Sequence, residues 1–473
     1  MPAICKPFVK VFKTPELFYL FDVNTDLIQE ISRGLYEYIQ SDMDEKFRTE
    51  TVIKELNGLM DQGMVSINRP EKVGFIDDNY ISYQINNKMS QLVLQVTQSC
   101  NLVCGYCPYA NKTEQPLQRD HTGKVMSFET ARRAIDFLYE HSSDMNSVNI
   151  SFYGGEPLLN MDLIEKVVAY ADRVFLGKTL HYNMTTNATL LDERNIDFIV
   201  KHGISVMVSL DGPKQIHNKN RKKIDGSGSF EETFRGLIAL KQRYGKDYVS
   251  KLSISMVNDP RNDPDEVVGF LQKEEIRNIT VVMSALDDSM LDQKVVADSV
   301  FIEKYNYWMF LAYLDFLDII SDLTIPAFVS TYFMTLEEDY MKAHQRKIKL
   351  DKAVIPSGPC IPVKHKLFVS VDGTFYPCER VNEISDVMKI GNIDYGIEYE
   401  KLVSLCNLGV LSEESCRDCW AVRHCNLCCR DADGRSCLSS EEKMRHCMRS
   451  KRDAFSALRD YALIREVRTH YIF

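Results

Sequence analysis

The sequence of 473 residues lacks any run of about 18 uncharged apolar residues, the length that a membrane-spanning helix needs. Its first residues, MPAICKPFVKVFKTPELF, contain no long apolar core and no cleavage-site pattern of a secretory signal. A basic excess is also missing, because 57 Lys and Arg stand against 67 Asp and Glu, a net charge of -10. We therefore expect a cytoplasmic protein that spans no membrane, and no general binding of nucleic-acid backbones.

The chain shows no repeat of fixed period and no low-complexity tract. Hydrophobic residues make up 45% of it, which is ordinary for a globular protein. A chain of this length corresponds to about three domains. What the composition does supply is cysteine, and its distribution along the chain indicates a function.

The 14 cysteines are unevenly distributed: one is at position 5, three lie between 100 and 107, and ten lie between 360 and 447. In a cytoplasmic chain such cysteines are more often metal ligands or redox groups than disulfides. The two groups predict at least two metal-binding regions.

The first group lies in the segment QVTQSCNLVCGYCPYA (95–110), with the spacing C-x3-C-x2-C. Buried structural thiols are one interpretation, which this tight spacing disfavours. A structural zinc site takes four protein ligands, and the next cysteine in the chain is Cys360. A four-iron cluster normally takes four cysteines, so a cluster held by three keeps one iron open for another molecule. An open iron–sulfur cluster fits the spacing best.

The middle of the chain alternates apolar segments with amphipathic ones. Strands are predicted at 92–97, 148–154, 180–187, 204–212, 251–258 and 278–285, and helices at 127–142, 161–175, 192–203, 229–245 and 264–275. Such alternation is typical of a parallel sheet covered by helices. Six units predict an α/β fold with a partial (β/α)6 TIM-like barrel, whose site lies at the C-terminal ends of the strands.

Four motifs fall at those strand ends. The three-cysteine loop follows the first strand, FYGGEP (152–157) ends the second, TTN (185–187) ends the third, and SLDG (209–212) with HNKNR (217–221) follows the fourth. The two glycines let a ligand approach the backbone, and the glutamate offers a carboxylate to a cation. Each motif alone is commonly a plain turn or a solvated loop, but their shared placement favours a binding site.

The three-cysteine loop, GGEP and the six-unit barrel resemble the radical S-adenosylmethionine superfamily over roughly residues 90–285. The resemblance implies a [4Fe-4S] cluster on Cys100, Cys104 and Cys107, with an open iron that chelates the methionine part of S-adenosyl-L-methionine. It implies that the cofactor contacts Tyr106 at the adenine, Gly154, Gly155 and Glu156 at the amino group, and Asn187, Ser209 and Arg221 on the same rim. In such enzymes a 5′-deoxyadenosyl radical forms and removes a hydrogen atom from the substrate.

The second cysteine group reads C-x12-G-x4-C from Cys360 to Cys378, then C-x2-C-x5-C-x3-C, and then Cys447. A zinc ribbon separates its pairs by about 15–20 residues, far more than the five here. The pattern resembles the SPASM extension of radical enzymes, which carries two auxiliary [4Fe-4S] clusters, three clusters in all. The resemblance implies an outer cluster on Cys416, Cys419, Cys425 and Cys447, and an inner one on Cys360, Cys378 and Cys429. Cys428 is an alternative to Cys429 as a ligand of the inner cluster, and the spacing favours Cys429. The sequence leaves open whether the inner cluster has an open iron. The cysteines without an assignment are Cys5, Cys406, Cys428 and Cys437.

Residues 1–86 differ from the rest of the chain. Strands are predicted at 9–12 and 18–23, and helices at 27–41 and 49–65, which suggests a winged-helix-like α+β module. It resembles the leader-binding module of peptide maturases, which pairs an extended leader with a strand edge; a plain N-terminal extension is the alternative. The predicted domains are thus this module at 1–86, the barrel at 87–288, a helical bridge at 289–354 and the SPASM domain with a C-terminal helix at 355–473.

The leading hypothesis is a maturase that forms thioether crosslinks in a ribosomally made, cysteine-containing peptide, with electrons from a flavodoxin- or ferredoxin-class donor. Carbon–carbon or carbon–oxygen crosslinking is a variant. An anaerobic sulfatase-maturing enzyme, which makes formylglycine, is the first alternative. Those enzymes typically carry aspartate where this chain has Glu379, which is a candidate catalytic base. An electron-transfer or peptide-docking protein and a nucleic-acid-modifying radical enzyme are the remaining alternatives.

Overall fold

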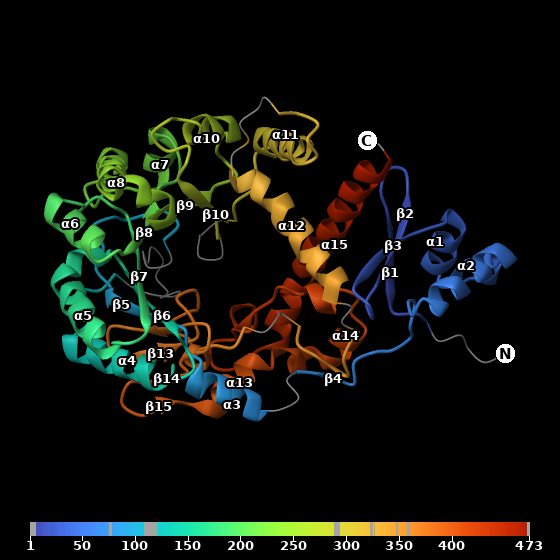
Figure 1. The fold of residues 1–473 in the computed structure, drawn as a ribbon, viewed down its shortest axis with the longest axis horizontal. Helices are drawn as coiled ribbons and strands as arrows, with labels where there is room; N and C mark the ends of the chain where they lie inside the picture. Colours follow the sequence, from blue (N-terminus) through green and yellow to red (C-terminus); the bar gives the residue numbers. More distant parts are fainter. Residues whose placement is uncertain are drawn as a thin grey trace. The chain divides into compact units, whose positions relative to one another are not determined.

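The computed structural model describes residues 6–74, 78–107, 121–287, 294–321, 325, 327–346, 349–356 and 360–470. The chain forms two compact units (Figure 1). The barrel unit comprises Asn79–Thr331 and Ile361–Leu402, and the terminal unit comprises Met1–Asp78, Tyr332–Cys360 and Val403–Phe473. Each unit is described by itself below.

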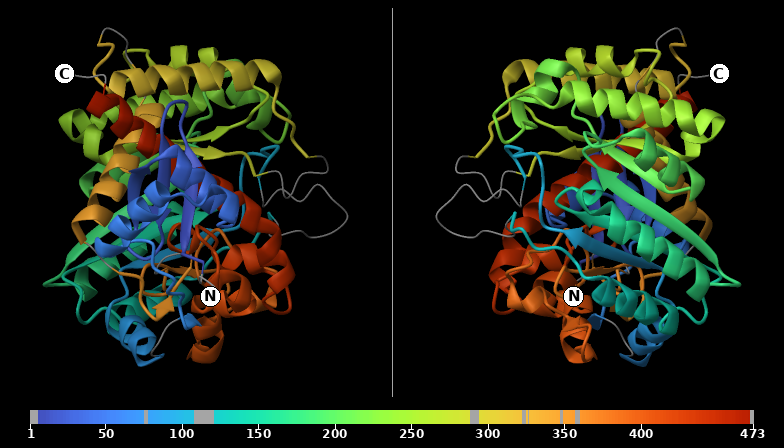
Figure 2. Two further views of the ribbon diagram at one scale, coloured as in Figure 1. Left: turned by 90° about the vertical axis from the view of Figure 1, so that its right-hand side faces the viewer. Right: turned by 90° about the vertical axis from the view of Figure 1, so that its left-hand side faces the viewer.

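The barrel unit is built on one sheet with the strand order β10-β9-β8-β7-β6-β5-β12-β13-β14-β15. Its six parallel strands are β5 (Gln91–Thr97), β6 (Ser147–Gly154), β7 (Thr179–Thr186), β8 (Ser205–Ser209), β9 (Leu252–Asn258) and β10 (Thr280–Ala285). The helices between them include α4 (Phe128–Glu140), α5 (Met161–Val174), α6 (Glu193–Lys201), α7 (Lys214–Asn220), α8 (Phe230–Tyr244) and α10 (Pro264–Leu271). The six strands and their outer helices confirm the predicted α/β fold with a partial barrel (Figure 2).

Alternate residues of these strands point to opposite sides of the sheet. The side that meets the helices is apolar, as at the fully buried Ile150, Val206 and Ile254. The inner side carries mainly short polar side chains, including Ser151, Asn183, Ser205, Ser253, Ser255 and Ser284, which line one cavity. The inner side is therefore shaped for a polar guest.

Four strands from the C-terminal third extend this sheet: β12 (Leu367–Val369), β13 (Thr374–Tyr376), β14 (Gly391–Asn392) and β15 (Gly396–Ile397). β12 runs parallel to β5, with Leu367 opposite Leu92. The sequence prediction did not foresee this pairing.

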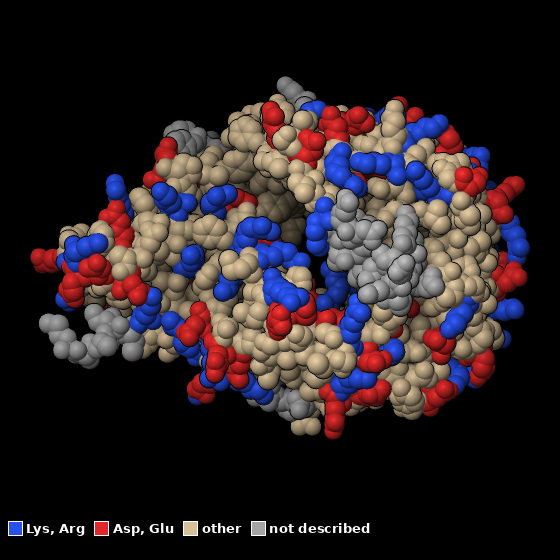
Figure 3. Space-filling model, turned by 180° about the vertical axis from the view of Figure 1, so that it is seen from behind, with Lys and Arg blue, Asp and Glu red and all other residues tan. Residues whose placement is uncertain are grey.

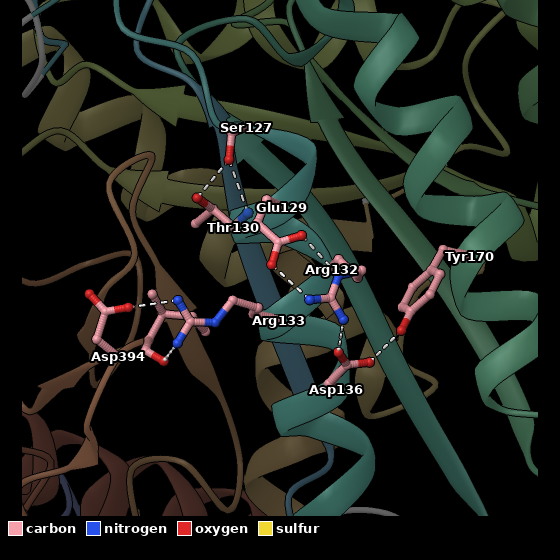
Figure 4. A network of polar contacts seen from close by, with 9 residues as sticks. Ser127, Glu129, Thr130, Arg132, Arg133, Asp136, Tyr170 and Asp394 are labelled. Carbon is pink, nitrogen blue, oxygen red and sulfur yellow. Dashed lines mark hydrogen bonds and ion pairs between the residues drawn. The ribbon is translucent and has the colours of Figure 1, made fainter.

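A polar network outside the barrel fixes α4 in its place (Figure 4). Arg132 of α4 binds Asp136 at 2.8 Å, and Tyr170 of α5 donates to the same carboxylate at 2.6 Å. Arg133, the next residue of α4, binds Asp394 between β14 and β15 at 2.6 Å. The last strands of the sheet are therefore also tied to a barrel helix.

The terminal unit begins with an antiparallel sheet of β1 (Val9–Lys13), β2 (Phe18–Asp22) and β3 (Leu27–Ile31), in that order. One face packs on α1 (Arg33–Gln40) and α2 (Glu50–Asp61) through a core that includes Leu20, Leu35 and Leu56. The other face contacts α15 (Ser440–His470), where Tyr19 donates a hydrogen bond to Glu466 at 3.1 Å.

The prediction of one helix over residues 27–41 is wrong in its first part, because Leu27–Ile31 forms β3. Ile31 pairs with Phe18 of β2, so its apolar side chain is buried in the sheet. Ser32 then begins the helix by accepting a hydrogen bond from the Leu35 N–H at 3.1 Å. A serine cap in the middle of the segment separates the two elements.

The remaining helices and strands belong to neither of these two sheets nor to the helices already named. They are β4 (Lys72–Val73), α3 (Asp78–Asn87), α11 (Ser299–Phe316), α12 (Ala327–Arg346), β11 (Ala353–Val354), α13 (Tyr399–Cys406) and α14 (Glu413–Arg417). Among the helices that the structure describes, none combines the length and the apolar character that crossing a bilayer requires. Basic and acidic side chains are interspersed over much of the face seen in Figure 3.

Candidate functional site

A cavity of about 160 Å³ lies at the C-terminal ends of β6, β7 and β8. Its lining includes all ten residues that the resemblance assigns to the first cluster and the cofactor: Cys100, Cys104, Tyr106, Cys107, Gly154, Gly155, Glu156, Asn187, Ser209 and Arg221. The structure thus brings the four motifs together at one rim. Their roles as ligands remain predictions.

The two glycines of GGEP have a structural reason that the sequence prediction did not contain. A Cβ atom on Gly154 would stand 2.1 Å from the Thr97 carbonyl oxygen, and one on Gly155 would stand 2.1 Å from that of Ser99. The end of β6 therefore lies directly against the backbone that leads into the three-cysteine loop. Any larger residue at these positions would displace the loop.

Glu156 is a buried carboxylate without a cationic partner among the described residues. It accepts hydrogen bonds from the Thr186 hydroxyl at 2.6 Å and from the Asn187 N–H at 2.7 Å, and both donors are neutral. Burial raises the pKa of Glu156 to about 6, against the effect of these hydrogen bonds. A buried carboxylate beside a cavity favours a cation there. The ammonium group of S-adenosyl-L-methionine fits this requirement.

Arg221 is held by Asp211, a residue that the sequence analysis did not single out. Its Nε and Nη2 atoms donate to Asp211 at 3.0 and 3.1 Å, and the Val257 N–H donates to the same carboxylate at 3.1 Å. The Tyr106 hydroxyl also donates to Asp211. Asp211 therefore connects the three-cysteine loop, strand β9 and the guanidinium group of Arg221. In the sequence, the signal for Asp211 was its place in the SLDG motif.

The side chain of Asn187 forms hydrogen bonds within the protein, whereas Ser209 is known only as part of the cavity lining. The Asn187 side chain donates to Asn101 Oδ1 at 2.9 Å and accepts from the Thr189 hydroxyl at 2.7 Å. It is therefore already used to hold the three-cysteine loop to the end of β7. Ser209 lines the cavity from the end of β8.

The three cysteine side chains lie on the same cavity wall. Burial raises the pKa of Cys100 to about 12 and that of Cys104 to about 11, with Arg221 opposing the rise at Cys104. Such thiols become thiolates only when a metal centre takes them up. His121, which sequence reasoning missed, places its Nε2 atom 3.9 Å from the Cys107 sulfur.

Within the described part of the chain, no group of three potential ligands is close enough to share a single metal ion. A cubane cluster binds each thiolate to a different iron, so its ligands stand further apart than those of one ion. The three cysteines that line the cavity, together with a buried carboxylate that has no cationic partner among the described residues, fit a cluster with its cofactor better than zinc.

A second cavity, of about 430 Å³, occupies the inner side of the barrel sheet. Tyr153 and Thr185 line both cavities, so the two adjoin. The described residues provide no hydrogen-bond partner for the side chains of Asn183, Ser253 or Ser255. The sequence signal for this surface was the strict alternation in segments such as LSISMVN, which we interpreted only as strand.

Glu379 lines the inner cavity and binds Lys366 at 2.9 Å. Its side chain is 15% exposed. The candidate base thus lies within the barrel unit, beside the space for a substrate, and its catalytic role remains a prediction. Arg380 lines the same cavity, and no described residue forms an ion pair with it.

The four cysteines of the predicted outer cluster are neighbours in the terminal unit. Burial raises the pKa of both Cys419 and Cys447, and the charges of Cys416 and Cys425 add to both shifts. Cys416 and Cys425 therefore lie close enough to both Cys419 and Cys447 to act on them, which fits a shared metal centre.

The predicted inner cluster draws its cysteines from both units. Cys360 and Cys429 belong to the terminal unit and Cys378 belongs to the barrel unit, so this ligand set stays a prediction. Burial, together with the charge of Cys360, raises the pKa of the unassigned Cys406 to about 12. A hydrogen bond with Cys429 lowers the pKa of Cys428 to about 7. Cys437 is exposed, and Cys5 lies outside the described residues.

Comparison with known proteins agrees with this site. Residues 94–273 match the family model of the Radical SAM superfamily. An uncharacterized protein of Methanocaldococcus jannaschii is 36% identical over 194 residues, which cover 41% of this chain and 62% of that protein. The cysteine-type anaerobic sulfatase-maturating enzyme of Clostridium perfringens (strain ATCC 13124) is 25% identical over 367 residues, which cover 72% of this chain and 89% of that enzyme.

The fold is shared with a solved structure, native anSMEcpe with bound AdoMet, at a TM-score of 0.57 and 22% identity. The match covers 80% of this chain and 99% of that one. The chain spans less than two thirds of the M. jannaschii protein. The region that matches the Radical SAM superfamily, residues 94–273, thus contains the cysteine-lined cavity with Cys100, Cys104 and Cys107.

Proposed function

We propose that this chain is a peptide maturase that forms thioether crosslinks in a ribosomally made, cysteine-containing precursor. The observation that carries the proposal is the contact between two cavities. Tyr153 and Thr185 line both the cofactor cavity and the polar cavity inside the barrel. A peptide segment in the inner cavity would therefore lie next to the reactive end of the cofactor.

The residues of the first cavity bind and orient the cofactor. Glu156 provides a buried negative charge for the amino group, and Asp211 fixes the orientation of Arg221. Cys100, Cys104 and Cys107 would hold the cluster and this cavity would hold S-adenosylmethionine, which together would supply the radical chemistry needed to remove a hydrogen atom from carbon. The auxiliary clusters predicted on the C-terminal cysteines would supply an acceptor for the second electron.

The inner cavity is suited to an extended peptide. Hydroxyl and amide groups on successive strands, such as Asn183, Ser205 and Ser255, offer donors and acceptors to peptide bonds. A target segment would be held mainly by its backbone, so several side chains could be presented to the radical in turn.

The N-terminal module supports binding of a leader segment. Within the described residues, β3 has a strand neighbour on one side only, which is β2. A cavity of about 150 Å³ is lined by Ile28, Gln29 and Glu30 of β3 and by Arg465 of α15. An extended leader would add a strand at this edge. Main-chain hydrogen bonds would give affinity, and the cavity would take one leader side chain.

Anaerobic sulfatase maturation is the second candidate. The similarity to the C. perfringens enzyme extends over 72% of this chain, well beyond the radical SAM domain. Glu379 stands in the inner cavity, where a base for oxidising a cysteine or serine would be needed. The N-terminal module and the glutamate in place of aspartate favour the peptide maturase.

The test uses anaerobically reconstituted protein, S-adenosylmethionine, a low-potential reductant and the cysteine-containing peptide encoded beside the gene. The peptide mass is recorded before and after alkylation of thiols. A thioether removes two hydrogens, keeps the sulfur and blocks alkylation, whereas formylglycine loses the sulfur. The same peptide without its leader segment should react far more slowly.

A Cys104→Ala chain is the control, because it should form no 5′-deoxyadenosine. An unchanged peptide mass together with abundant 5′-deoxyadenosine would reject that peptide as the substrate. Loss of sulfur from a sulfatase-derived peptide would replace the maturase proposal by the second candidate. Equal rates with and without the leader would refute the role of β3.

A further inference from the structure

Lys443, in the first turn of α15, is one of the largest fully buried side chains of the described structure, with 1% of its surface exposed. Lysine is almost never buried to this degree unless its charge is paired. No described carboxylate forms an ion pair with it. The source of its compensating charge therefore needs an explanation.

The ammonium group has three N–H donors, and the structure shows an acceptor for each. The Leu408 carbonyl oxygen lies at 2.9 Å, the Ser412 hydroxyl oxygen at 2.7 Å and the Cys416 sulfur at 3.8 Å. The two oxygens are neutral. The sulfur is the one partner of the three that can carry negative charge, and Cys416 belongs to the predicted outer cluster.

We propose that Lys443 is the buried counter-charge of the outer auxiliary cluster and sets its reduction potential. This inference rests on the proposed auxiliary cluster at Cys416, Cys419, Cys425 and Cys447. Hydrogen bonds to the sulfurs and the local charge are the protein's main means of tuning such a cluster. A reduced cluster is more negative than an oxidised one, so a fixed cation at Cys416 stabilises the reduced state and raises the potential.

A second lysine provides a matched control. Burial raises the pKa of the Cys447 thiol, and the charges of Lys443 and Lys451 both oppose that rise. Lys451 lies about two turns further along α15 and is partly exposed, whereas Lys443 is sealed from water. Solvent screens the charge of Lys451, so replacing it should move the potential much less.

The experiment uses the full chain with Cys100, Cys104 and Cys107 changed to alanine, so that bound iron reports the C-terminal cysteines alone. Iron content and reduction midpoints are measured by potentiometric titration with electron paramagnetic resonance. K443M should lower one midpoint by at least the equivalent of a tenfold change in the reduction equilibrium, about 59 mV for one electron. K443R, which keeps the charge, and K451M should leave that midpoint near its original value.

Thermal unfolding gives an independent readout if K443M binds little iron. In the metal-free chain K443M should be at least as stable as the parent, because an uncompensated buried cation has been removed. In the iron-loaded chain it should be less stable. Equal destabilisation of both forms, or an unchanged midpoint in an iron-loaded K443M chain, would make Lys443 a plain structural residue. Absence of iron from the triple-alanine parent would instead refute the auxiliary clusters themselves.

Discussion

Asp211→Asn is the substitution that most directly tests how the cofactor cavity is built. Asp211 and Arg221 form a bidentate ion pair whose side chains are 2% and 10% exposed. Removing the charge of one partner leaves the other buried and unpaired, which typically costs about 3–5 kcal/mol. Asparagine keeps one acceptor for the Val257 N–H, so we expect the lower end of that range, about 3 kcal/mol. The barrel unit should lose this much local stability.

Hydrogen exchange followed by mass spectrometry measures that loss where it occurs. At 1.36 kcal/mol for each factor of ten, about 3 kcal/mol makes exchange of the amides in β8 and β9 roughly a hundredfold faster. The metal-free protein is used, so that the effect does not depend on cluster loading. Affinity for S-adenosylmethionine in the reconstituted enzyme should fall as well, because Arg221 loses its fixed orientation.

Asp259→Asn is the matched control. Asp259 is also buried, with 1% of its side chain exposed, and binds Arg261 at 2.6 Å, but the Arg261 side chain is 42% exposed. Its guanidinium group can turn to water, so the lost pair costs about 1 kcal/mol or less. If exchange in Asp211→Asn is no faster than in Asp259→Asn, the claim that Asp211 holds a buried cation in place is refuted.

Three further predictions concern the same two cavities. Because burial raises the pKa of Glu156 to about 6, the folded chain holds a proton that the unfolded chain releases from about pH 4.5 upward. The metal-free protein should therefore lose about 2 kcal/mol of stability between about pH 4.5 and pH 6.5, and Glu156→Gln should abolish that loss in denaturation curves measured at each pH. Gly155→Ala places a Cβ atom 2.1 Å from the Ser99 carbonyl oxygen, which displaces the three-cysteine loop, so the iron bound per chain should fall sharply. In the control Gly123→Ala, the added Cβ atom meets nothing within 4 Å, so this variant should bind iron normally. Arg380→Gln should raise the KM of peptides with an acidic residue near the target by about tenfold, because one charge-assisted hydrogen bond is lost. The KM of the matching peptides with Asn or Gln at that position should stay unchanged. Equal effects on both kinds of peptide would argue against binding of a carboxylate by Arg380.

The barrel was predictable because its signals are local. Each of the first five strands is followed by an amphipathic helix, and the predicted strand ends agree with the observed ones within about three residues. The cavity followed from the same pattern, since parallel strands bring the segments after their C-terminal ends to one rim. Tyr106 and Glu156, 50 positions apart, could therefore be assigned to one site before any coordinates were known.

What sequence reasoning missed depends on contacts between distant segments. Nothing near Leu367 indicates that it pairs with Leu92, because a strand of three residues has no recognisable period. Lys443 looks like one charge among many in a polar helix, and only its burial against Cys416 sets it apart. The first part of the predicted helix at 27–41 failed for the same reason, since Leu27–Ile31 becomes a strand by pairing with β2, where Ile31 lies opposite Phe18.

The pairing of β12 with β5 joins the start of the cysteine-rich C-terminal segment to the barrel within one unit. The strand β13 ends at Tyr376, and the predicted cluster ligand Cys378 follows two residues later. Glu379 and Arg380 come next and line the inner cavity. A cluster bound through Cys378 would therefore be one peptide bond from a residue of the substrate space. Because the same hydrogen-bonded sheet positions the cavity and the segment with Cys378, a peptide in the cavity would lie near a cluster able to accept its electron. An electron carrier that docks elsewhere on the protein would not need the two to be this close.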